Sequence, residues 1–265
     1  MIAAFPFSRC GGSYPARMPL VVYAVSAALI LFLARRCVAP IRARVLIAIA
    51  LLPLAMTGRA MLTGRLIAPV EMPYMTEPLY AMKNAHGVGG MYNGVLFDIA
   101  WQMLPWRAAV RDAFMHREWP LLNRSILGGD LLASAAQPAA YSPITWISCL
   151  LPPAESFNVS ASLTLLLAAL GAFLFAAELG CGEGIALFAA IGWMLSTPIS
   201  AFAMWPLGAS WAPLPFLTAG GATLRTHALV SLGSVADDRA HARHAQRTSR
   251  VAAARSDFRR GVRRV

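Results

Sequence analysis

The stretch Ser156–Ala177, SFNVSASLTLLLAALGAFLFAA, decides the fold because it offers 22 consecutive residues without a charge. A helix that crosses a bilayer needs about 20 mostly apolar residues. Gly171 lies in the apolar half of the stretch and provides a notch against which a neighbouring helix can pack closely. The stretch therefore predicts a membrane-spanning helix, with the rest of the chain arranged around it.

Composition points to the same class of protein. Of the 265 residues, 58% are hydrophobic and only 13% are charged, and the mean hydropathy is +0.57. A water-soluble fold would lack polar surface at this composition, so the bilayer is the predicted partner. The net charge of +11 does not indicate a nucleic-acid partner, because +7 of it lies in residues 225–265, where ten Arg stand against three Asp.

The cysteines do not predict a metal site or a disulfide framework. They are too far apart for a C-x-x-C pair, and no histidine stands at ligand spacing from any of the four, Cys10, Cys37, Cys149 and Cys181. No cofactor is predicted either.

Two segments near the amino terminus are predicted to cross the membrane as well. Met18–Ala34 is uncharged and is followed by two arginines. Val45–Leu62 is apolar but contains Pro53 and Arg59, so it crosses only if the Arg59 side chain reaches the membrane surface. Residues 1–62 are therefore predicted to hold two spans joined by a basic loop.

The predicted spans resume after the central one. Residues 184–224 carry no charge over a length that is about twice a bilayer thickness, and four prolines divide them. One span is predicted over Ile185–Met204, and a second begins near Ala212. The fold class predicted is an all-α polytopic membrane protein with about four to five transmembrane helices.

Arginine counts predict the orientation of the chain. The loop between the first two spans, RRCVAPIRAR, carries four arginines in ten residues, against two before the first span. This loop is expected in the cytoplasm, which places residues 63–155 in an extracytoplasmic loop between residues 1–62 and the spans of 156–224. A cleaved signal peptide is the rival interpretation of the first span, but two arginines stand where a small-residue cleavage site should follow.

The outer loop is predicted to carry interfacial helices. Apolar residues recur at steps of three and four, which indicates a helix on the membrane surface, either an anchor or a substrate site: Ile99, Met103, Trp106, Val110 and Phe114. Trp119–Pro120 is expected to end this helix, and Gly128–Gly129 to form a tight turn. Leu131–Ala154 is uncharged but holds four prolines, so it is predicted to be interfacial or re-entrant.

A series of short motifs from about Asp98 to Leu217 is similar to a known family. The series comprises Asp98, Pro105–Trp106, Trp119–Pro120–Leu121 with Asn123, Gly128–Gly129, Tyr141–Ser142–Pro143, Leu151–Pro152, LLAALGAFLFAAELG, AAIGWMLSTPISAF and WPLGASWAPLPFL. In these residues the chain resembles the bacterial YfhO-like membrane proteins. The resemblance implies a multi-pass inner-membrane protein like the type C glycosyltransferases, which transfer sugar from a polyprenyl-phosphate donor on the outer face.

The same resemblance implies site residues in the outer loop. In those enzymes an acid of the first large outer loop acts near the acceptor, and the matching position is Asp98. A carboxylate can take a proton from an acceptor hydroxyl while cations hold the departing phosphate. The candidate substrate-binding residues are Arg107, Arg111, Arg117, Asn123 and Arg124. Alternatively, or in addition, Asp98 caps the helix that starts at Ile99. No D-x-D pair is present to support a metal-bound donor.

Residues 225–265 differ in character from the rest of the chain. They are rich in Arg, Ala, Val and Ser and keep no helical or strand periodicity, so disorder is expected. One interpretation is a basic cytoplasmic tail. The other, which we favour, is an out-of-frame translation of a GC-rich gene, so that the chain is an amino-terminal fragment.

A second class of function is a non-catalytic integral membrane protein, such as a transporter fragment or an assembly partner. Transporters place ionisable residues inside their spans. Here Arg59 and Glu178 stand only at span ends, which gives that class little support.

Overall fold

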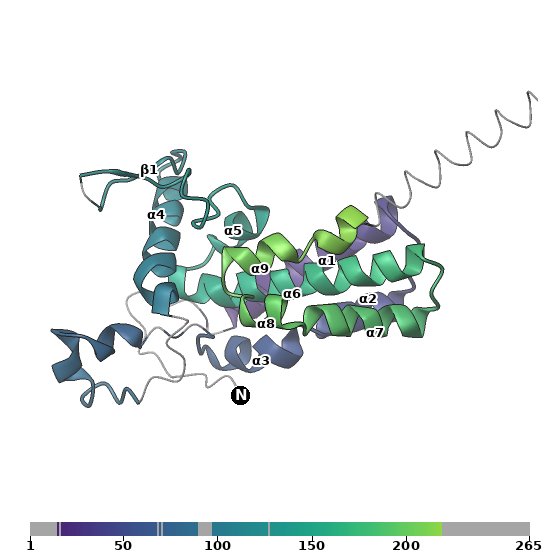
Figure 1. Cartoon of the computed structure of the whole chain (residues 1–265), viewed down its shortest axis with the longest axis horizontal. Helices are drawn as coiled ribbons and strands as arrows, with labels where there is room; N and C mark the ends of the chain where they lie inside the picture. The colour runs from purple at the N-terminus through teal and green to yellow at the C-terminus, as the bar shows by residue number, and fades with distance from the viewer. Residues whose placement is uncertain are drawn as a thin grey trace, which may run out of the picture. The chain divides into compact units, whose positions relative to one another are not determined.

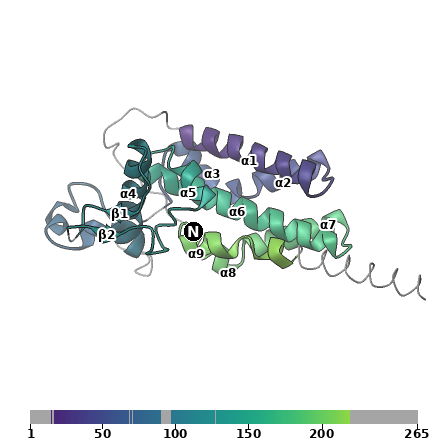
Figure 2. The same ribbon diagram turned by 90° about the horizontal axis from the view of Figure 1, so that it is seen from above.

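Helix α6 (Pro153–Glu178) is the centre of the computed structural model, which describes residues 15, 17–67, 69, 71–89, 97–126 and 128–218. Its apolar residues are almost all buried, because helices from both earlier and later parts of the chain pack on it (Figure 1). The helices around it are α1 (Met18–Cys37), α2 (Ala43–Leu51), α3 (Leu54–Thr63), α7 (Glu183–Met194), α8 (Thr197–Ala201) and α9 (Pro206–Trp211). Figure 2 shows α1 along one side of α6 and α8 along the other.

The remaining elements belong to the segment between α3 and α6. They are η1 (Met72–Met75), η2 (Leu79–Met82), the π-helical turn η4 (Ile99–Met103), α4 (Leu104–Met115), β1 (Leu122–Asn123), β2 (Asp130–Leu131) and α5 (Pro143–Ser148). β1 and β2 pair antiparallel, and Gly128 and Gly129 between them both have positive φ. Glycine adopts such φ values without steric cost, so the turn predicted at this position is confirmed.

Two described helices, α1 and α6, are long and apolar enough to cross a membrane, and a third crossing exists if the bent pair α2–α3 counts as one. The spans predicted over Met18–Ala34 and Ser156–Ala177 are thus confirmed as helices of spanning length. The notch at Gly171 is also confirmed, because a Cβ there would lie 2.7 Å from the ring of Phe216.

The stretch predicted as one span over Ile185–Met204 is not one continuous helix. α7 ends at Met194, and a separate short helix, α8, begins after Ser196 with Pro198 in its first turn. Proline cannot donate the backbone hydrogen bond that a continuing helix needs, which explains the break. The span expected to begin near Ala212 is described only to Thr218, and residues 225–265 lie outside the described residues.

α2 and α3 meet at an angle of 62°, and Pro53 lies at the break. The N–H groups of Ala55 and Met56 bond to the carbonyls of Leu52 and Pro53, so the regular helical ladder is interrupted there. The Tyr23 hydroxyl of α1 donates a 2.6 Å hydrogen bond to the Ala50 carbonyl just before the break. A side chain of the neighbouring helix α1 thus bonds to a backbone carbonyl beside the proline break. In a bilayer interior such a carbonyl has no water to bond to, so it needs a partner within the protein.

Replacing Tyr23 with phenylalanine is expected to lower the free energy of unfolding by about 1 kcal/mol, since one intramolecular hydrogen bond is lost without loss of the ring. Unfolding of the purified protein in mixed micelles with increasing SDS measures the effect. Tyr80→Phe is the control, because Tyr80 is half exposed. Equal stabilities for the two variants would mean that the Tyr23 hydroxyl contributes nothing.

Polar contacts mark the two ends of the helix bundle. At one end Glu183 accepts from Arg44 at 2.6 Å and from Arg42 at 3.2 Å, which joins the start of α2 to the start of α7. At the other end the Asn158 amide donates to the Arg65 carbonyl at 2.7 Å, and its oxygen accepts from the Ile67 amide at 3.0 Å. The segment between α3 and α6 therefore leaves the bundle and returns at the end opposite the basic loop (Figure 1).

The helix predicted in that segment is confirmed, but its apolar face lies against protein. Ile99 and Met103 join the core around α6, and Val110 packs with Leu132, Ala140 and Cys149. These side chains therefore pack on protein, and the position of the helix at the membrane surface stays a prediction.

The helix also ends at Met115 rather than at Trp119–Pro120. Arg117 has φ 58°, and the Glu118 amide bonds back to the Ala113 carbonyl at 2.8 Å. This pattern closes a helix with a residue in the left-handed region, so the backbone turns before the proline is reached.

Candidate anion-binding site

Arg107 is the one charged residue of α4 that is buried, with 6% of its surface exposed. Its Nη1 donates a 3.3 Å hydrogen bond to the Ser156 hydroxyl, and its guanidinium lies 5.0 Å from the ring centre of Phe157. Among the described residues no carboxylate pairs with it. A guanidinium has five N–H donors and stays charged in proteins, so Arg107 is a buried cation with donor capacity to spare.

The local sequence explains how a charged side chain comes to lie in this place. Arg107 stands four residues after Met103 and three before Val110, so it shares their buried helix face. η4 precedes it: the Leu104 amide bonds to the Ile99 carbonyl five residues back, just before Pro105. Such π turns change the rotation of the helix locally and are often found at functional sites.

Hydroxyl groups of α6 lie on the side of that helix towards Arg107. Ser156, Ser160 and Thr164 recur every four residues, so they follow one side of the helix, and all three are buried. Ser156 also donates to the Pro153 carbonyl at 2.6 Å, and Ser160 to the Phe157 carbonyl at 3.2 Å. The amino-terminal half of α6 is therefore a polar wall within an otherwise apolar helix.

A small cavity of about 10 Å³, enough for about one water molecule, lies between Arg107, Ser160 and Thr164 on one side and the α8–α9 turn on the other. Trp205 lines it, and its indole N–H is buried without an acceptor among the described residues. The polar residues that line the cavity are Arg107, Ser142, Thr145, Ser160, Thr164 and Trp205. Each of these side chains carries a hydrogen-bond donor, although the Ser160 proton is bonded to the Phe157 carbonyl, and the lining contains no carboxylate.

Arg111 lies one turn further along α4, and its Nε is buried without a hydrogen-bond partner among the described residues. The charges of Arg107 and Arg111 both influence the pKa of Cys149, which lies in the α5–α6 connection. Burial raises the pKa of the Cys149 thiol, and the charges of Arg107 and Arg111 oppose that shift. Burial in turn lowers the pKa of Arg107 from its usual value. The two cations therefore share one electropositive, water-poor region.

Asp98 immediately precedes η4 and is partly buried. Its φ and ψ of −61° and −21° are helical, and its side chain makes no capping hydrogen bond. The interpretation of Asp98 as a helix cap is therefore wrong, because a capping residue has extended backbone and bonds to an amide of the first turn. Asp98 is not among the residues that line the Arg107 cavity.

The other candidate residues lie away from Arg107. Arg117 is exposed at the end of α4, and Arg124 is exposed with an ion pair to Glu118 at 3.3 Å. Asn123 is buried in β1, where its side-chain oxygen accepts from the Ser125 amide at 3.1 Å. The structure thus brings together Arg107 and Arg111 of the five candidates, whereas Arg117 lies just after α4 and Asn123 and Arg124 lie in and after β1.

The sequence interpretation missed two participants, Ser156 and Trp205. The four-residue spacing of small hydroxyl residues in an apolar helix was the available signal for Ser156. No signal existed for Trp205, since only the fold brings the α8–α9 turn beside α4. The described residues hold no group of three or more His, Cys, Asp or Glu side chains that could bind a metal ion.

Comparison of the chain with protein-family models, with curated proteins and with solved structures found no match.

Proposed function

We propose that the protein is a glycosyltransferase-like protein of the bacterial inner membrane that crosses the bilayer several times and binds a polyprenyl-phosphate sugar donor. The observation that supports this proposal is the buried Arg107, which has hydroxyl and indole donors around it and no carboxylate partner among the described residues. The two apolar helices of spanning length support the membrane setting.

A phosphate group suits this surrounding better than water does. Burying a cation without a counter-ion is costly, and a phosphate oxygen would offset that cost through charge-assisted hydrogen bonds. Arginine binds such oxygens with two parallel N–H groups, a geometry that lysine lacks. The cavity must widen to admit a phosphate, and the α8–α9 turn that carries Trp205 is one wall that could move, because both of its helices are short.

The proposed reaction breaks the bond between the sugar C1 and the phosphate oxygen of the donor and forms a bond from C1 to an acceptor oxygen. The acceptor proton passes to the Asp98 carboxylate, and the polyprenyl phosphate leaves with the bonding electrons. Arg107 and Arg111 stabilise the charge that develops on the leaving phosphate.

A second candidate is a non-catalytic integral membrane protein in which Arg107 only fastens α4 to α6. The 3.3 Å bond to Ser156 and the contact with the Phe157 ring favour it, since both are structural interactions made without a ligand. The two candidate functions differ in whether a phosphate ligand binds to the donor groups at the cavity.

Binding of undecaprenyl phosphate to the full chain in lipid nanodiscs separates them. Arg107→Lys should weaken binding about tenfold, because it keeps the charge but loses the paired donors, and Trp205→Phe about three- to tenfold, because it removes one N–H donor. Trp205→Phe breaks no hydrogen bond among the described residues, so folding should be unchanged.

Trp193→Phe is the matched control. Trp193 of α7 also has a buried indole N–H without a described partner, but it does not line the cavity. The Trp193→Phe variant should bind undecaprenyl phosphate with the affinity of the unmodified protein. Absence of binding by the unmodified protein, or equal affinities for all four proteins, would favour the purely structural role of Arg107.

A further inference from the structure

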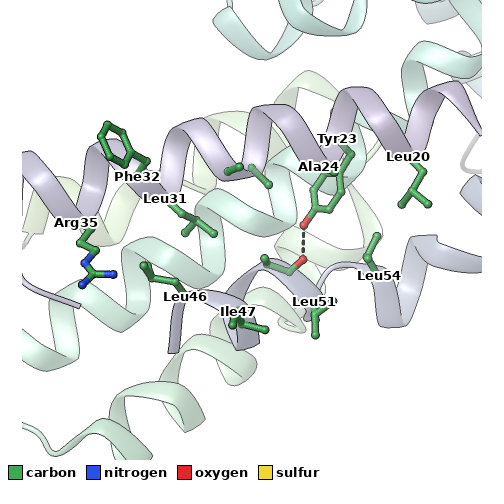
Figure 3. A pocket seen from close by; sticks show the side chains of 13 residues that line it. Leu20, Tyr23, Ala24, Leu31, Phe32, Arg35, Leu46, Ile47, Leu51 and Leu54 are labelled. Carbon is green, nitrogen blue, oxygen red and sulfur yellow. Dashed lines mark hydrogen bonds between the residues drawn. The ribbon is translucent and has the colours of Figure 1, made fainter. Parts of the chain in front are cut away.

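A groove of about 410 Å³ runs along α1 where this helix faces α2 and the start of α3 (Figure 3). The α1 residues that line it recur at steps of three and four from Leu20 to Arg35, so they form one helix face over most of its length. Apart from Tyr23 and Arg35, every lining residue is apolar. The groove is separate from the Arg107 cavity, and no part of the inference below depends on the proposed function.

Two features of the sequence leave this space open. α1 presents Ala24, Ala27 and Ala28 to it, and these side chains end at Cβ and fill little of the space. The bend at Pro53 turns α3 away from the direction of α2, so the partner cannot follow α1 in a straight line. The short alanine side chains and the change of direction at Pro53 thus coincide with the open groove.

The base of the groove offers no free polar backbone at Ala50. Tyr23 projects from α1 and donates its hydroxyl proton to the Ala50 carbonyl, as Figure 3 shows. With this carbonyl occupied, the groove suits a hydrocarbon chain rather than a hydrogen-bonding ligand. Phe32, Ile47 and Leu51 on its margins are more than half exposed, which in a bilayer means contact with lipid.

A cation stands at one end of the groove. Arg35 lies in the last turn of α1 and lines the groove, with its guanidinium on the same side as Leu46 in Figure 3. Arg42 and Arg44, at the same end of the bundle, share the carboxylate of Glu183. Arg35 has no ion pair among the described residues, so its charge is available to a headgroup.

We propose that this groove binds one acyl chain of an anionic phospholipid, with the lipid phosphate on Arg35. An apolar channel with a cation at its headgroup end matches a lipid that has a hydrocarbon tail and a negative phosphate group. An empty groove would deprive its lining of dispersion contacts, and a chain restores them. Arg35 then makes the site selective for negative headgroups, since one arginine at a membrane surface favours anionic lipid by about 1 kcal/mol.

The test uses the full chain in vesicles of phosphatidylcholine with spin-labelled phosphatidylglycerol or spin-labelled phosphatidylcholine. Electron paramagnetic resonance measures the motionally restricted fraction of each label. The unmodified protein should prefer phosphatidylglycerol about fivefold, the ratio that corresponds to about 1 kcal/mol. Arg35→Gln should abolish the preference. Ala28→Phe should reduce the restricted fraction for both labels, because its ring fills the groove from an exposed position.

Each variant has a matched control on the same helix. Arg36→Gln removes the neighbouring charge, which does not line the groove, and Val25→Phe adds a ring at an exposed position outside it. Both should behave as the unmodified protein does.

Three outcomes would overturn the proposal. They are equal restriction of the two lipids by the unmodified protein, an equal loss of preference in Arg35→Gln and Arg36→Gln, and a change of oligomeric state in Ala28→Phe by mass photometry. The first would show that the site has no headgroup preference, and the second that the attraction is general to the membrane surface. The third would show that a second copy of the chain covers the groove.

Discussion

Asn158→Leu is expected to lower the free energy of unfolding by about 1 to 4 kcal/mol, because it leaves one buried and one partly buried backbone group without their side-chain partner, and a fully buried group costs about 1 to 3 kcal/mol. The groups are the carbonyl of Arg65 and the amide of Ile67, which the Asn158 side chain binds at 2.7 Å and 3.0 Å. Leucine has a similar volume, so the loss would come from hydrogen bonding rather than from a cavity. Unfolding of the purified protein by SDS in mixed micelles measures it.

Ser162→Ala, one turn further along α6, is the matched control. The Ser162 hydroxyl oxygen lies 2.8 Å from the Asn158 carbonyl and 2.8 Å from the Thr57 hydroxyl, so its one proton bonds to one of them, and Thr57 bonds to the Pro53 carbonyl. The expected cost is about 1 kcal/mol or less. If Asn158→Leu proved no more harmful than this control, the Asn158 contacts would not be what fixes the segment that follows α3.

Asp98→Asn is expected to slow sugar transfer by about 10² to 10⁴, the usual contribution of a general base, if the proposed reaction is correct. Asparagine keeps the shape of the side chain but cannot take the acceptor proton. Since Asp98 makes no capping hydrogen bond, the substitution should leave the helix intact. The measurement follows release of polyprenyl phosphate from radiolabelled polyprenyl-phosphate hexoses by the full chain in proteoliposomes.

Asp112→Asn is the control for that experiment. Asp112 is an exposed acid of α4, and its carboxylate lies 3.4 Å from the His116 ring. The Asp112→Asn variant should transfer sugar at the rate of the unmodified protein. Unchanged transfer by the Asp98 variant would remove Asp98 from the chemistry. A rate that fell equally in both variants would point to damage to α4 instead.

The long helices were predictable because their signal is local. Uninterrupted apolar composition predicted α1 and α6, and the glycine in α6 predicted a close neighbour, which the ring of Phe216 provides. Pro53 predicted an irregularity in the second segment, but a proline does not specify the angle of the bend or the side chain that satisfies the backbone. Tyr23 lies 27 residues from Ala50, a relation that only packing creates.

The candidate site was predictable only in part. Arg107 was named from the sequence, and its spacing to Met103 and Val110 already placed it on the apolar face. A charge in that position is normally expected to turn towards water, so its burial was not expected. The approach of Trp205 depends on the tertiary arrangement of α8 and α9, and Arg117 and Arg124 lay near Arg107 in sequence alone.

The shared carboxylate of Glu183 makes one end of the bundle sensitive to ionic strength. Its two arginine partners are largely exposed, so dissolved ions reach the contact, and the screening length falls from about 8 Å in physiological salt to about 3 Å at 1 M. The apolar packing of α6 is not weakened in this way. Concentrated salt should therefore loosen the connection between the starts of α2 and α7 while the rest of the helix bundle stays assembled.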